Sequence, residues 1–335
     1  PYSMKDYIKL NTNESPFPPS EKSVEYAKAN TRPLNLYSDP ELAELTKKIA
    51  LYYKTDPSTV LVSNGSDEVL NFAFMAFTDD KTPAVFADIT YGFYPVFACL
   101  NGSAVDIVPL REDFSLNIDD YIGRNGTVFI ANPNAPTGLA VSVGEIERLI
   151  VSNPYRVVVV DEAYVDFGAK SCIRLVKKYD NLLVCQTFSK SRSFAGGRLG
   201  YAIGAKSLID DLKAIKYSTN PYNVNSMTSA MGIGILNDMP YYTENCRKIM
   251  ENRAFAVKEL KALGFTVLDS KANFIFVSSD RIEGEAYYRE LKEKGILVRH
   301  FNKDRISNWC RVSIGTKESI EALISKTKEI LGGTV

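Results

Sequence analysis

The fold is decided by two stretches of sequence, VVVVDEAYVDF from Val157 to Phe167 and LLVCQTFSKSRSFAGGRLGY from Leu182 to Tyr201. Each opens with a run of apolar residues in which polar and apolar positions do not alternate. Such a run is typical of a strand in a parallel sheet whose two faces are both covered. Asp161 ends the first run, and Lys190 follows the second. Because ligands of open α/β sheets bind beyond the carboxyl ends of the strands, both side chains are candidates for chemistry.

Outward from these stretches, short β-rich runs alternate with helical patterns. Gly144–Val151 has a helical pattern, and Ser66–Phe77 is apolar nearly all round, which predicts a buried helix. The repeated strand, helix and strand predict an α/β class with a large, doubly wound and mostly parallel sheet. The expected strands are Val60–Ser63, Ala84–Ala87, Val105–Val108, Thr127–Ala131, Val157–Asp161, Leu182–Thr187 and Leu199–Ile203.

After about Asn237 the pattern changes to that of a smaller α+β unit. A charged helix is expected over Thr243–Leu263 and a final helix over Lys317–Leu331. We therefore expect a large domain over 31–240 and a small domain made of 1–30 and 241–335. The expected strands of the small domain are Phe265–Leu268, Asn273–Val277, Leu297–Arg299 and Arg311–Ile314.

Composition narrows the class of protein. The 335 residues include 40 basic and 40 acidic ones, so the net charge is zero. No overall positive charge therefore favours binding to nucleic acid or to a membrane surface. The 5 cysteines are widely spaced without a CxxC pair, which favours reduced thiols in a cytoplasmic protein over disulfides or a metal site. The single histidine, His300, excludes a multi-histidine metal site and predicts that another group transfers protons.

Two loops could bind an anion or a ligand. Ser63–Glu68 has a glycine for a tight turn and Ser66 as a cap before an apolar helix, which makes an anion site at a helix N-terminus. Asn132–Gly138, with the sequence NPNAPTG, is rigid and can point its amides at a ligand. Ordinary helix capping and an ordinary βα turn explain each loop equally well when it is taken alone.

The two strand-end groups each have an alternative interpretation. Asp161 emerges from a dry apolar strand and requires a cationic partner, or else it caps the next turn. Lys190 lies among aromatic residues and glycines, where a lysine can become a nucleophile toward a carbonyl, or else it is a surface lysine of a loop. The order of the features favours chemistry, because an anion site, a rigid loop, an aspartate and a lysine occur on separate strands of one sheet. Pyridoxal phosphate requires these groups.

At this point the chain resembles the fold-type-I pyridoxal-phosphate-dependent aminotransferases. The resemblance covers the chain from about Leu10 to Thr316, and LNTNESP and PYNVN point more narrowly to the histidinol-phosphate branch. The motifs that carry it are LNTNESPFPPS (Leu10–Ser20), YSDP (Tyr37–Pro40), NGSDE (Asn64–Glu68), TYGFY (Thr90–Tyr94), NPNAPTG (Asn132–Gly138), VVDEAY (Val159–Tyr164), TFSKSRSFAGGRLGY (Thr187–Tyr201), PYNVN (Pro221–Asn225) and RVSIGT (Arg311–Thr316).

The resemblance implies a set of catalytic roles. Lys190 would bind the aldehyde of the cofactor and, once freed by the substrate, move the proton between the substrate Cα and the cofactor C4′. Asp161 would pair with the pyridinium nitrogen. Tyr164 would hydrogen-bond the 3-oxygen of the ring, and Tyr91 would stack on the ring face.

It also implies how the cofactor phosphate is held. Ser66, Asp67, Ser189 and Arg198 would bind the phosphate within one subunit. Tyr37 would reach the cofactor phosphate and the substrate of the neighbouring subunit, so the resemblance implies a homodimer with shared sites.

For the substrate, the resemblance assigns Arg311 to a carboxylate, Arg299 to a phosphate, and Asn13 to the same pocket. The chain departs from the family at two positions. Ala135 stands where the family has the asparagine that contacts the 3-oxygen, and we expect the adjacent Asn134 to replace it. Phe17 stands where many relatives have a tyrosine.

The implied reaction is transamination between L-histidinol phosphate and 2-oxoglutarate, a step of histidine biosynthesis. Threonine-phosphate decarboxylases and aromatic amino acid aminotransferases share most of the motifs and remain alternatives. A non-enzymatic regulator of the same fold would be expected to lack Lys190 or Asp161, and both are present.

Overall fold

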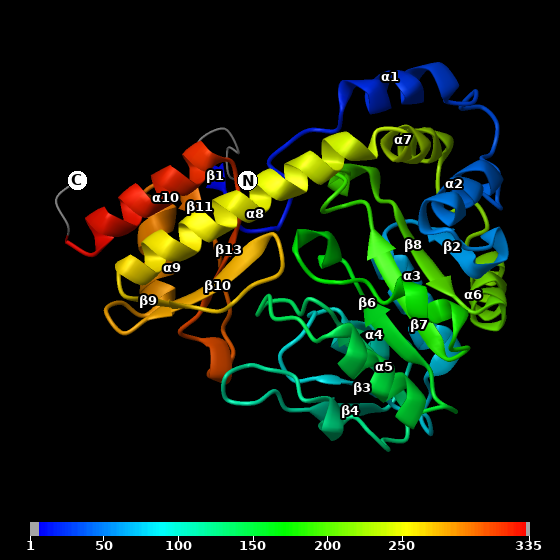
Figure 1. Cartoon of the computed structure of the whole chain (residues 1–335), viewed down its shortest axis with the longest axis horizontal. Helices are drawn as coiled ribbons and strands as arrows, with labels where there is room; N and C mark the ends of the chain where they lie inside the picture. Colours follow the sequence, from blue (N-terminus) through cyan, green and yellow to red (C-terminus); the bar gives the residue numbers. More distant parts are fainter. Residues whose placement is uncertain (1–6, 333–335) are drawn as a thin grey trace.

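The computed structural model describes residues 7–332, which form two parts joined by a long helix (Figure 1). The larger part is built on a seven-stranded sheet in the order β2-β8-β7-β6-β5-β3-β4. Its strands are β2 (Val60–Ser63), β3 (Ala84–Ala87), β4 (Val105–Val108), β5 (Thr127–Ala131), β6 (Val158–Asp161), β7 (Leu182–Thr187) and β8 (Gly200–Gly204).

The sheet is mostly parallel, as the sequence predicts. Strands β7, β6, β5, β3 and β4 run in parallel, while β8 is antiparallel to both β2 and β7. In register, Ala131 of β5 lies beside Asp161 of β6, and Asp161 lies beside Cys185 of β7. The carboxyl ends of the three central strands therefore meet at one edge, where the candidate site lies.

Helices cover both faces of the large sheet, because successive residues of each strand point to opposite sides. In β6, Val158 and Val160 pack with one apolar cluster, and Val159 packs with the other. The helices of this part are α2 (Ala43–Tyr53), α3 (Ser66–Phe77), α4 (Tyr94–Leu100), α5 (Val143–Ser152), α6 (Lys206–Thr219) and α7 (Ser226–Leu236).

The smaller part has its own apolar cluster around an antiparallel sheet in the order β12-β13-β10-β9. The joining helix α8 (Met239–Ala262) and helices α9 (Gly284–Glu293) and α10 (Lys317–Ile330) pack with it. Its strands are β9 (Phe265–Val267), β10 (Phe274–Ser279), β11 (Ile296–Leu297), β12 (Arg299–His300) and β13 (Cys310–Ser313). The expected strand Leu297–Arg299 is split in two, because β11 pairs with β1 (Ile8–Lys9) and β12 pairs with β13.

The N-terminal segment divides between the two parts. Strand β1 joins the smaller part, whereas α1 (Glu21–Asn30) packs against α7 of the larger part (Figure 1). The division at residues 30 and 240 remains a prediction, and the packing of α1 favours placing its first boundary before Glu21. Residues 1–6 and 333–335 of the predicted small domain lie outside the described residues.

A mixed polar and apolar junction holds the two parts together. Ile89 of the larger part shares a buried apolar cluster with Phe276 and Ile306 of the smaller part. Beside it, the Arg305 guanidinium forms an ion pair with Asp88 at 2.6 Å and donates to two backbone carbonyls of the larger part. This junction fixes the loop that follows β12 against the edge of the large sheet.

Close packing of β8 against the start of α3 requires Gly200. A Cβ added there would lie 2.3 Å from the backbone nitrogen of Ser66 and 2.4 Å from the carbonyl carbon of Gly65. We predict that Gly200→Ala lowers the free energy of unfolding by about 1–3 kcal/mol, because backbone atoms must move apart. Urea unfolding followed by circular dichroism measures this. Gly92→Ala is the control, since its Cβ would meet nothing within 4 Å, and equal stability of the two variants would contradict the prediction.

Candidate active site

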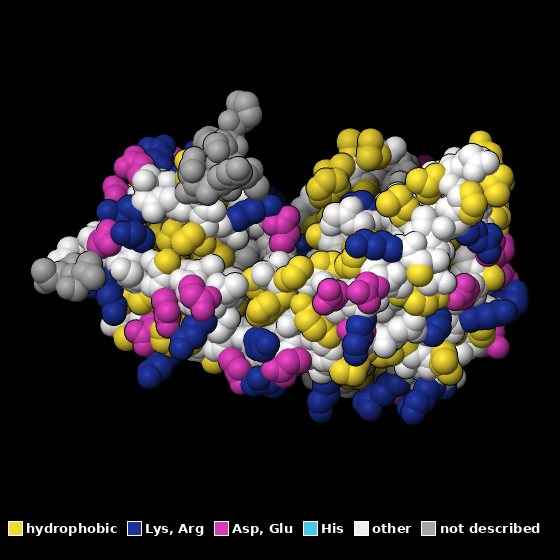
Figure 2. All heavy atoms as spheres, turned by 90° about the horizontal axis from the view of Figure 1, so that it is seen from above, with side chains coloured by type: hydrophobic (Ala, Val, Ile, Leu, Met, Phe, Trp, Pro, Cys, Tyr) yellow, Lys and Arg dark blue, Asp and Glu magenta, His cyan; other side chains and the backbone are white. Residues whose placement is uncertain are grey.

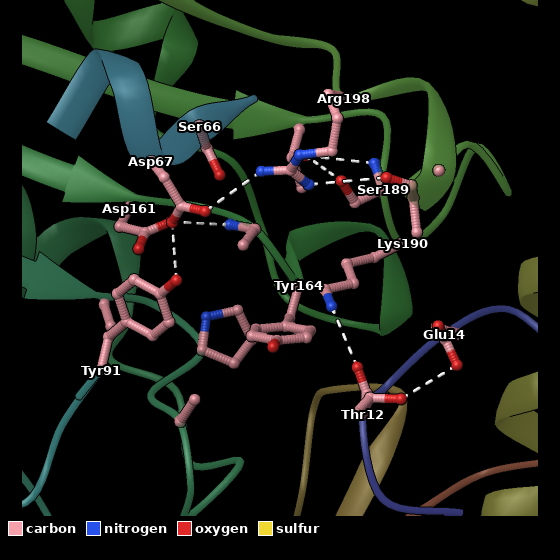
Figure 3. A pocket seen from close by; sticks show the side chains of 17 residues that line it. Thr12, Glu14, Ser66, Asp67, Tyr91, Asp161, Tyr164, Ser189, Lys190 and Arg198 are labelled. Carbon is pink, nitrogen blue, oxygen red and sulfur yellow. Dashed lines mark hydrogen bonds and ion pairs between the residues drawn. The ribbon is translucent and has the colours of Figure 1, made fainter. Parts of the chain in front are cut away.

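A pocket of about 330 Å³ opens at the carboxyl ends of β5, β6 and β7 (Figure 3). It brings together most of the residues that the sequence singles out, and the first turn of α3 and the N-terminal segment complete its walls. The predicted site residues that line it are Ser66, Asp67, Tyr91, Asp161, Tyr164, Ser189, Lys190 and Arg198.

Asp161 lies in this pocket with 5% of its surface exposed. Its hydrogen-bond donors, the Tyr94 hydroxyl and the backbone N–H of Ala163, lie 3.1 Å away and are both neutral. Burial raises the pKa of Asp161 to about 6, although these two hydrogen bonds oppose the rise. A buried carboxylate without a cation beside it is suited to a cationic ligand.

Lys190 projects into the same pocket from the loop after β7. Its Nζ donates to the backbone carbonyl of Thr12 at 3.3 Å and lies 5.7 Å from the ring centroid of Tyr164 (Figure 3). The loop is tightened by a hydrogen bond from the N–H of Phe194 to the carbonyl of Phe188 at 3.0 Å. The backbone that carries Lys190 is therefore held in place. Among the described residues, the Thr12 carbonyl is the hydrogen-bond acceptor of the amine, and a ligand can replace this long hydrogen bond.

The start of α3 lines one end of the pocket and has the features expected of an anion site. Gly65, at φ 82°, is the N-cap residue, and Ser66 is the first residue of the helix, so the expectation that Ser66 caps it is wrong. Since no side chain caps the first turn, its backbone N–H groups remain for a ligand. Arg198, at φ 53°, brings its guanidinium to 3.2 Å from Asp67, and a Cβ at Gly65 would lie 2.7 Å from Arg198 Nη2. Ser189 Oγ accepts from Thr187 at 3.0 Å, which leaves its own hydrogen for an anion.

Two tyrosines form the walls between these ends. Tyr91 donates its hydroxyl to Asp67 at 2.6 Å, so its ring is held upright beside the pocket (Figure 3). Tyr164 packs edge-on against Phe274 at 5.0 Å and accepts a hydrogen bond from Asn13 Nδ2 at 3.1 Å.

A second pocket of about 480 Å³ adjoins the first, because both are lined by Thr12, Tyr91 and Ala135. Its lining contains three cationic side chains, Arg299, Arg311 and Lys303, and no carboxylate. The two guanidinium groups each lie 5.7 Å from the Phe301 ring centroid. Burial, and to a lesser degree Arg299, lowers the pKa of Arg311. The positive charge of this lining makes the pocket suitable for binding an anion.

Three predicted residues lie elsewhere. Asn134 does not line the first pocket, because its amide donates to the Ile89 carbonyl and to Thr137 and accepts from Thr90 at 2.8 Å. The geometry therefore disagrees with the expectation that Asn134 takes the role of the family asparagine whose position Ala135 occupies.

Asn13 and Tyr37 also lie outside the pocket lining. Asn13 is 1% exposed and is directed at Tyr164 and Ser313 instead of the substrate pocket. Tyr37 is 79% exposed and stacks on Tyr222 at 4.5 Å.

Sequence reasoning missed Thr12, Glu14 and Lys303, which line the pockets. The basic run RHFNKDR from Arg299 to Arg305 is a signal that could have found Lys303. Thr12 and Glu14 lie within the LNTNESP motif, but their position over the pocket depends on long-range contacts. In the described part of the chain, no cluster of three histidine, cysteine, aspartate or glutamate side chains could hold a metal ion. No helix there has the length and apolar character that crossing a membrane requires.

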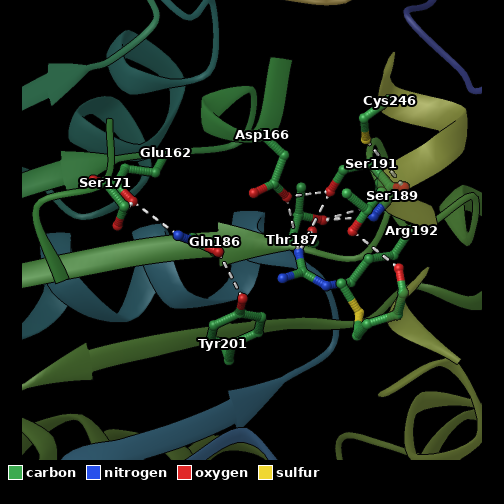
Figure 4. A network of polar contacts seen from close by, with 12 residues as sticks. Glu162, Asp166, Ser171, Gln186, Thr187, Ser189, Ser191, Arg192, Tyr201 and Cys246 are labelled. Carbon is green, nitrogen blue, oxygen red and sulfur yellow. Dashed lines mark hydrogen bonds and ion pairs between the residues drawn. The ribbon is translucent and has the colours of Figure 1, made fainter. Parts of the chain in front are cut away.

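A buried polar network behind the site was also missed (Figure 4). Glu162 accepts from the N–H of Cys172 and the hydroxyl of Ser171 at 2.6 Å, and from Gln186 Nε2 at 2.8 Å. Gln186 Oε1 in turn accepts from the Tyr201 hydroxyl at 2.6 Å.

The network continues to the Lys190 loop. Tyr53 donates to the same Gln186 oxygen at 2.7 Å and accepts from Arg192 Nη2 at 2.9 Å. Arg192 is 1% exposed and lies 5.1 Å from the Phe188 ring centroid. These bonds tie the strand end that carries Asp161 to the loop that carries Lys190.

The comparisons with known proteins agree with this geometry. Residues 5–326 match the model of the aminotransferase class I and II family, and the chain belongs to that family. A relative in Brachyspira hyodysenteriae named histidinol-phosphate aminotransferase is 47% identical over 331 residues, which cover 98% of this chain and 93% of the relative.

Solved structures show the same fold. A putative histidinol-phosphate aminotransferase from Erwinia carotovora atroseptica has a TM-score of 0.90 at 26% identity, with 97% of this chain and 96% of that chain covered. The histidinol-phosphate aminotransferase from Sinorhizobium meliloti, solved in complex with pyridoxal-5′-phosphate, has a TM-score of 0.88 at 22% identity, with coverage of 97% and 91%.

Glu162 makes the stability of the fold depend on pH. Burial raises the pKa of Glu162 to about 7, above its ordinary value of 4.5. The folded state therefore binds the Glu162 proton more tightly than the unfolded chain does. The free energy of unfolding consequently falls as the pH rises from 4.5 through about 7. We predict that, from pH 4.5 to 8, the native chain loses on the order of 3 kcal/mol relative to Glu162→Gln.

Urea unfolding at several pH values measures this difference, with the exposed Glu25→Gln as control. If the stability curves of the native chain and Glu162→Gln run parallel across this pH range, the burial account of Glu162 is wrong.

Proposed function

We propose that this chain is a pyridoxal-phosphate-dependent aminotransferase that exchanges an amino group between L-histidinol phosphate and 2-oxoglutarate. The observation that carries the proposal is Asp161, a buried carboxylate whose partners are neutral, in one pocket with the amine of Lys190. Membership of the aminotransferase family and the relative at 47% identity support it. The reaction yields imidazole-acetol phosphate and glutamate and belongs to histidine biosynthesis.

The pocket fits the cofactor group by group. The uncapped first turn of α3, Arg198 and Ser189 would hold the phosphate. Asp161 would meet the pyridinium nitrogen, which supplies the cation that the carboxylate otherwise lacks. Lys190 would bind the aldehyde.

The side walls of the pocket fit the ring of the cofactor. Tyr164 would donate to the 3-oxygen, and Tyr91 would stack on the ring face. Asp67 supports this wall, because it accepts the Tyr91 hydroxyl and pairs with Arg198.

When bound, pyridoxal phosphate withdraws electrons from the substrate Cα and so makes the Cα proton acidic. Once the substrate amino group replaces Lys190 on the aldehyde, the freed Lys190 amine would take the Cα proton and return it at C4′, and so would serve as general base and general acid in turn. Asp161 would keep a proton on the ring nitrogen, since a buried carboxylate stabilises a cation beside it. The lining of this pocket contains no histidine, so Lys190 would carry out these transfers without one.

The second pocket would hold the anionic end of each substrate. Arg311 would bind the carboxylate of 2-oxoglutarate or glutamate, and its Nε has no partner in the described structure. Arg299 would bind the phosphate of histidinol phosphate. Lys303, which sequence reasoning did not include, adds a third cation to the same wall.

We further propose a cytoplasmic homodimer in which Tyr37 reaches the active site of the partner. Tyr37 lies with Leu34 and Leu36, which are 68% and 62% exposed, so an apolar segment is available for a second copy. Figure 2 shows apolar side chains gathered on the larger part, beside the notch that separates it from the smaller part. The free thiols of the 5 cysteines support the location in the cytoplasm.

Replacement of Lys190 tests the mechanism. We predict that Lys190→Ala lowers kcat by more than about a thousandfold and leaves the fold unchanged, because the general base is removed. Steady-state assays with L-histidinol phosphate and 2-oxoglutarate measure this, and circular dichroism checks the fold. Lys170→Ala, at an exposed lysine away from the pocket lining, is the control. Near-normal turnover by Lys190→Ala would end this mechanism.

Lys303 tests the substrate assignment. We predict that Lys303→Met raises the KM for L-histidinol phosphate by about twofold to fivefold, because an exposed ion pair contributes up to about 1 kcal/mol. The KM for 2-oxoglutarate should change less, because 2-oxoglutarate presents a singly charged carboxylate to this pocket, whereas histidinol phosphate presents a dianionic phosphate. Lys170→Met is the control for loss of charge. Equal changes in both KM values, or preference for phenylalanine or threonine phosphate as substrate, would contradict the assignment.

A further inference from the structure

Asn13 lies in a segment, Leu10–Glu14, that passes between the two parts of the molecule beside the active site. The backbone of Leu10 accepts from the N–H of Ser313 at 2.9 Å, and that of Thr12 accepts from Lys190. Asn13 adopts φ 56°, a left-handed conformation that asparagine tolerates better than most residues. Asn273 Nδ2 donates to its carbonyl at 2.9 Å, so the backbone here is held on both sides.

The hydrogen bonds around Asn13 have a fixed direction. Its backbone N–H donates to Ser313 Oγ at 2.8 Å, and the Ser313 hydroxyl donates to Asn13 Oδ1 at 2.8 Å. The side-chain nitrogen therefore faces Tyr164, and Nδ2 donates to the Tyr164 hydroxyl oxygen at 3.1 Å. In the opposite amide orientation, Nδ2 would face the buried Ser313 hydroxyl. That hydroxyl would then lose the Oδ1 acceptor to which it donates here.

This direction determines what Tyr164 can do. A tyrosine hydroxyl has one hydrogen to donate, and Asn13 occupies an acceptor position of its oxygen. The hydrogen is therefore left for a group in the pocket. Tyr164 matters more because Ala135 has no side-chain donor and the amide of Asn134 is engaged elsewhere.

We propose that Asn13 and Ser313 are positioning residues that direct the hydroxyl hydrogen of Tyr164 toward the 3-oxygen of the cofactor. The proposal rests on the function proposed above, in which Tyr164 contacts that oxygen. Because Ser313 belongs to β13 of the smaller part and Tyr164 follows β6 of the larger part, the relay also links the position of the smaller part to the chemistry of the site.

Asn13→Asp tests the proposal, since it keeps the shape and the backbone preference but replaces the donor with an acceptor. The Tyr164 hydroxyl then donates to the introduced carboxylate and turns away from the 3-oxygen. Without that donor, the 3-oxygen would carry more negative charge. It would therefore hold the proton on Lys190 Nζ, where Lys190 would bind the cofactor aldehyde, more tightly. We expect the pH midpoint of the visible band of the holoenzyme to rise by about one unit, as it should in Tyr164→Phe.

The added charge of the aspartate requires a control, because a charge alone could move the midpoint. The double variant Asn13→Asp with Tyr164→Phe separates the two effects. A relay through Tyr164 predicts little further shift in the Tyr164→Phe background, whereas a direct charge effect predicts the same shift in both backgrounds. The charged groups of the first pocket and of the wall beside Tyr164 stay unchanged in these variants, and they are Lys190, Arg311, Asp161, Asp67, Glu14 and Arg198.

Two further variants avoid the charge. Ser313→Ala frees the Asn13 amide to rotate and should shift the midpoint in the same direction by a smaller amount. It also carries the test if Asn13→Asp fails to fold. Asn13→Gly keeps the left-handed backbone and should shift the midpoint less than Asn13→Asp, since Tyr164 can still donate to the pocket.

The outcomes separate the two proposals. A visible band whose midpoint is unchanged in Asn13→Asp and Ser313→Ala, or an equal shift with and without Tyr164, overturns the relay while the proposed function stands. Absence of a band in the native protein saturated with pyridoxal phosphate overturns both.

Discussion

A carboxylate buried at the end of a strand is the constraint on which the rest of the site depends. Asp161 is surrounded by neutral donors, and burial raises its pKa to about 6. Such a group stabilises a cation at one point of the pocket, and a pyridinium nitrogen is a cation whose position the other walls fix. The first turn of α3 and the amine of Lys190 line the same pocket as Asp161, so the three groups together would define where the cofactor is held.

The scaffold keeps these groups in place through contacts that carry no chemistry. Parallel pairing aligns the ends of β5, β6 and β7 at one edge. The buried network from Glu162 to Arg192 ties the loop of Lys190 to the strand of Asp161 (Figure 4). The ion pair of Arg305 with Asp88 fixes the smaller part, and with it the cationic pocket, against the sheet. The cationic pocket therefore has walls from both parts, because Ile89 and Tyr91 of the larger part line it together with Arg299 and Arg311 of the smaller part.

Much of this could be predicted from the sequence. The strands of the large sheet were predictable within a residue or two, because short continuous apolar runs between turn residues are typical of buried parallel strands, and strand-end polar groups such as Asp161 and Lys190 stand out against them. The orientation of Asn134, the relay through Asn13 and the network around Glu162 were not predictable. Each depends on hydrogen bonds between residues far apart in the chain, and nothing in the local sequence indicates which acceptor an amide will choose. The packing of α1 on α7 was not predictable either, because it also depends on contacts between residues far apart in the chain.

The pocket is expected to bind pyridoxal phosphate through Lys190 and to accept the amino group of L-histidinol phosphate. The most direct test is the visible spectrum of the purified protein before and after L-histidinol phosphate is added without a keto acid. We predict a yellow protein whose band disappears on addition, as the amino group passes to the cofactor, and returns with 2-oxoglutarate. A protein that stays colourless after incubation with pyridoxal phosphate would contradict the proposed binding of the cofactor through Lys190. A band that L-histidinol phosphate leaves unchanged would contradict the proposed amino donor.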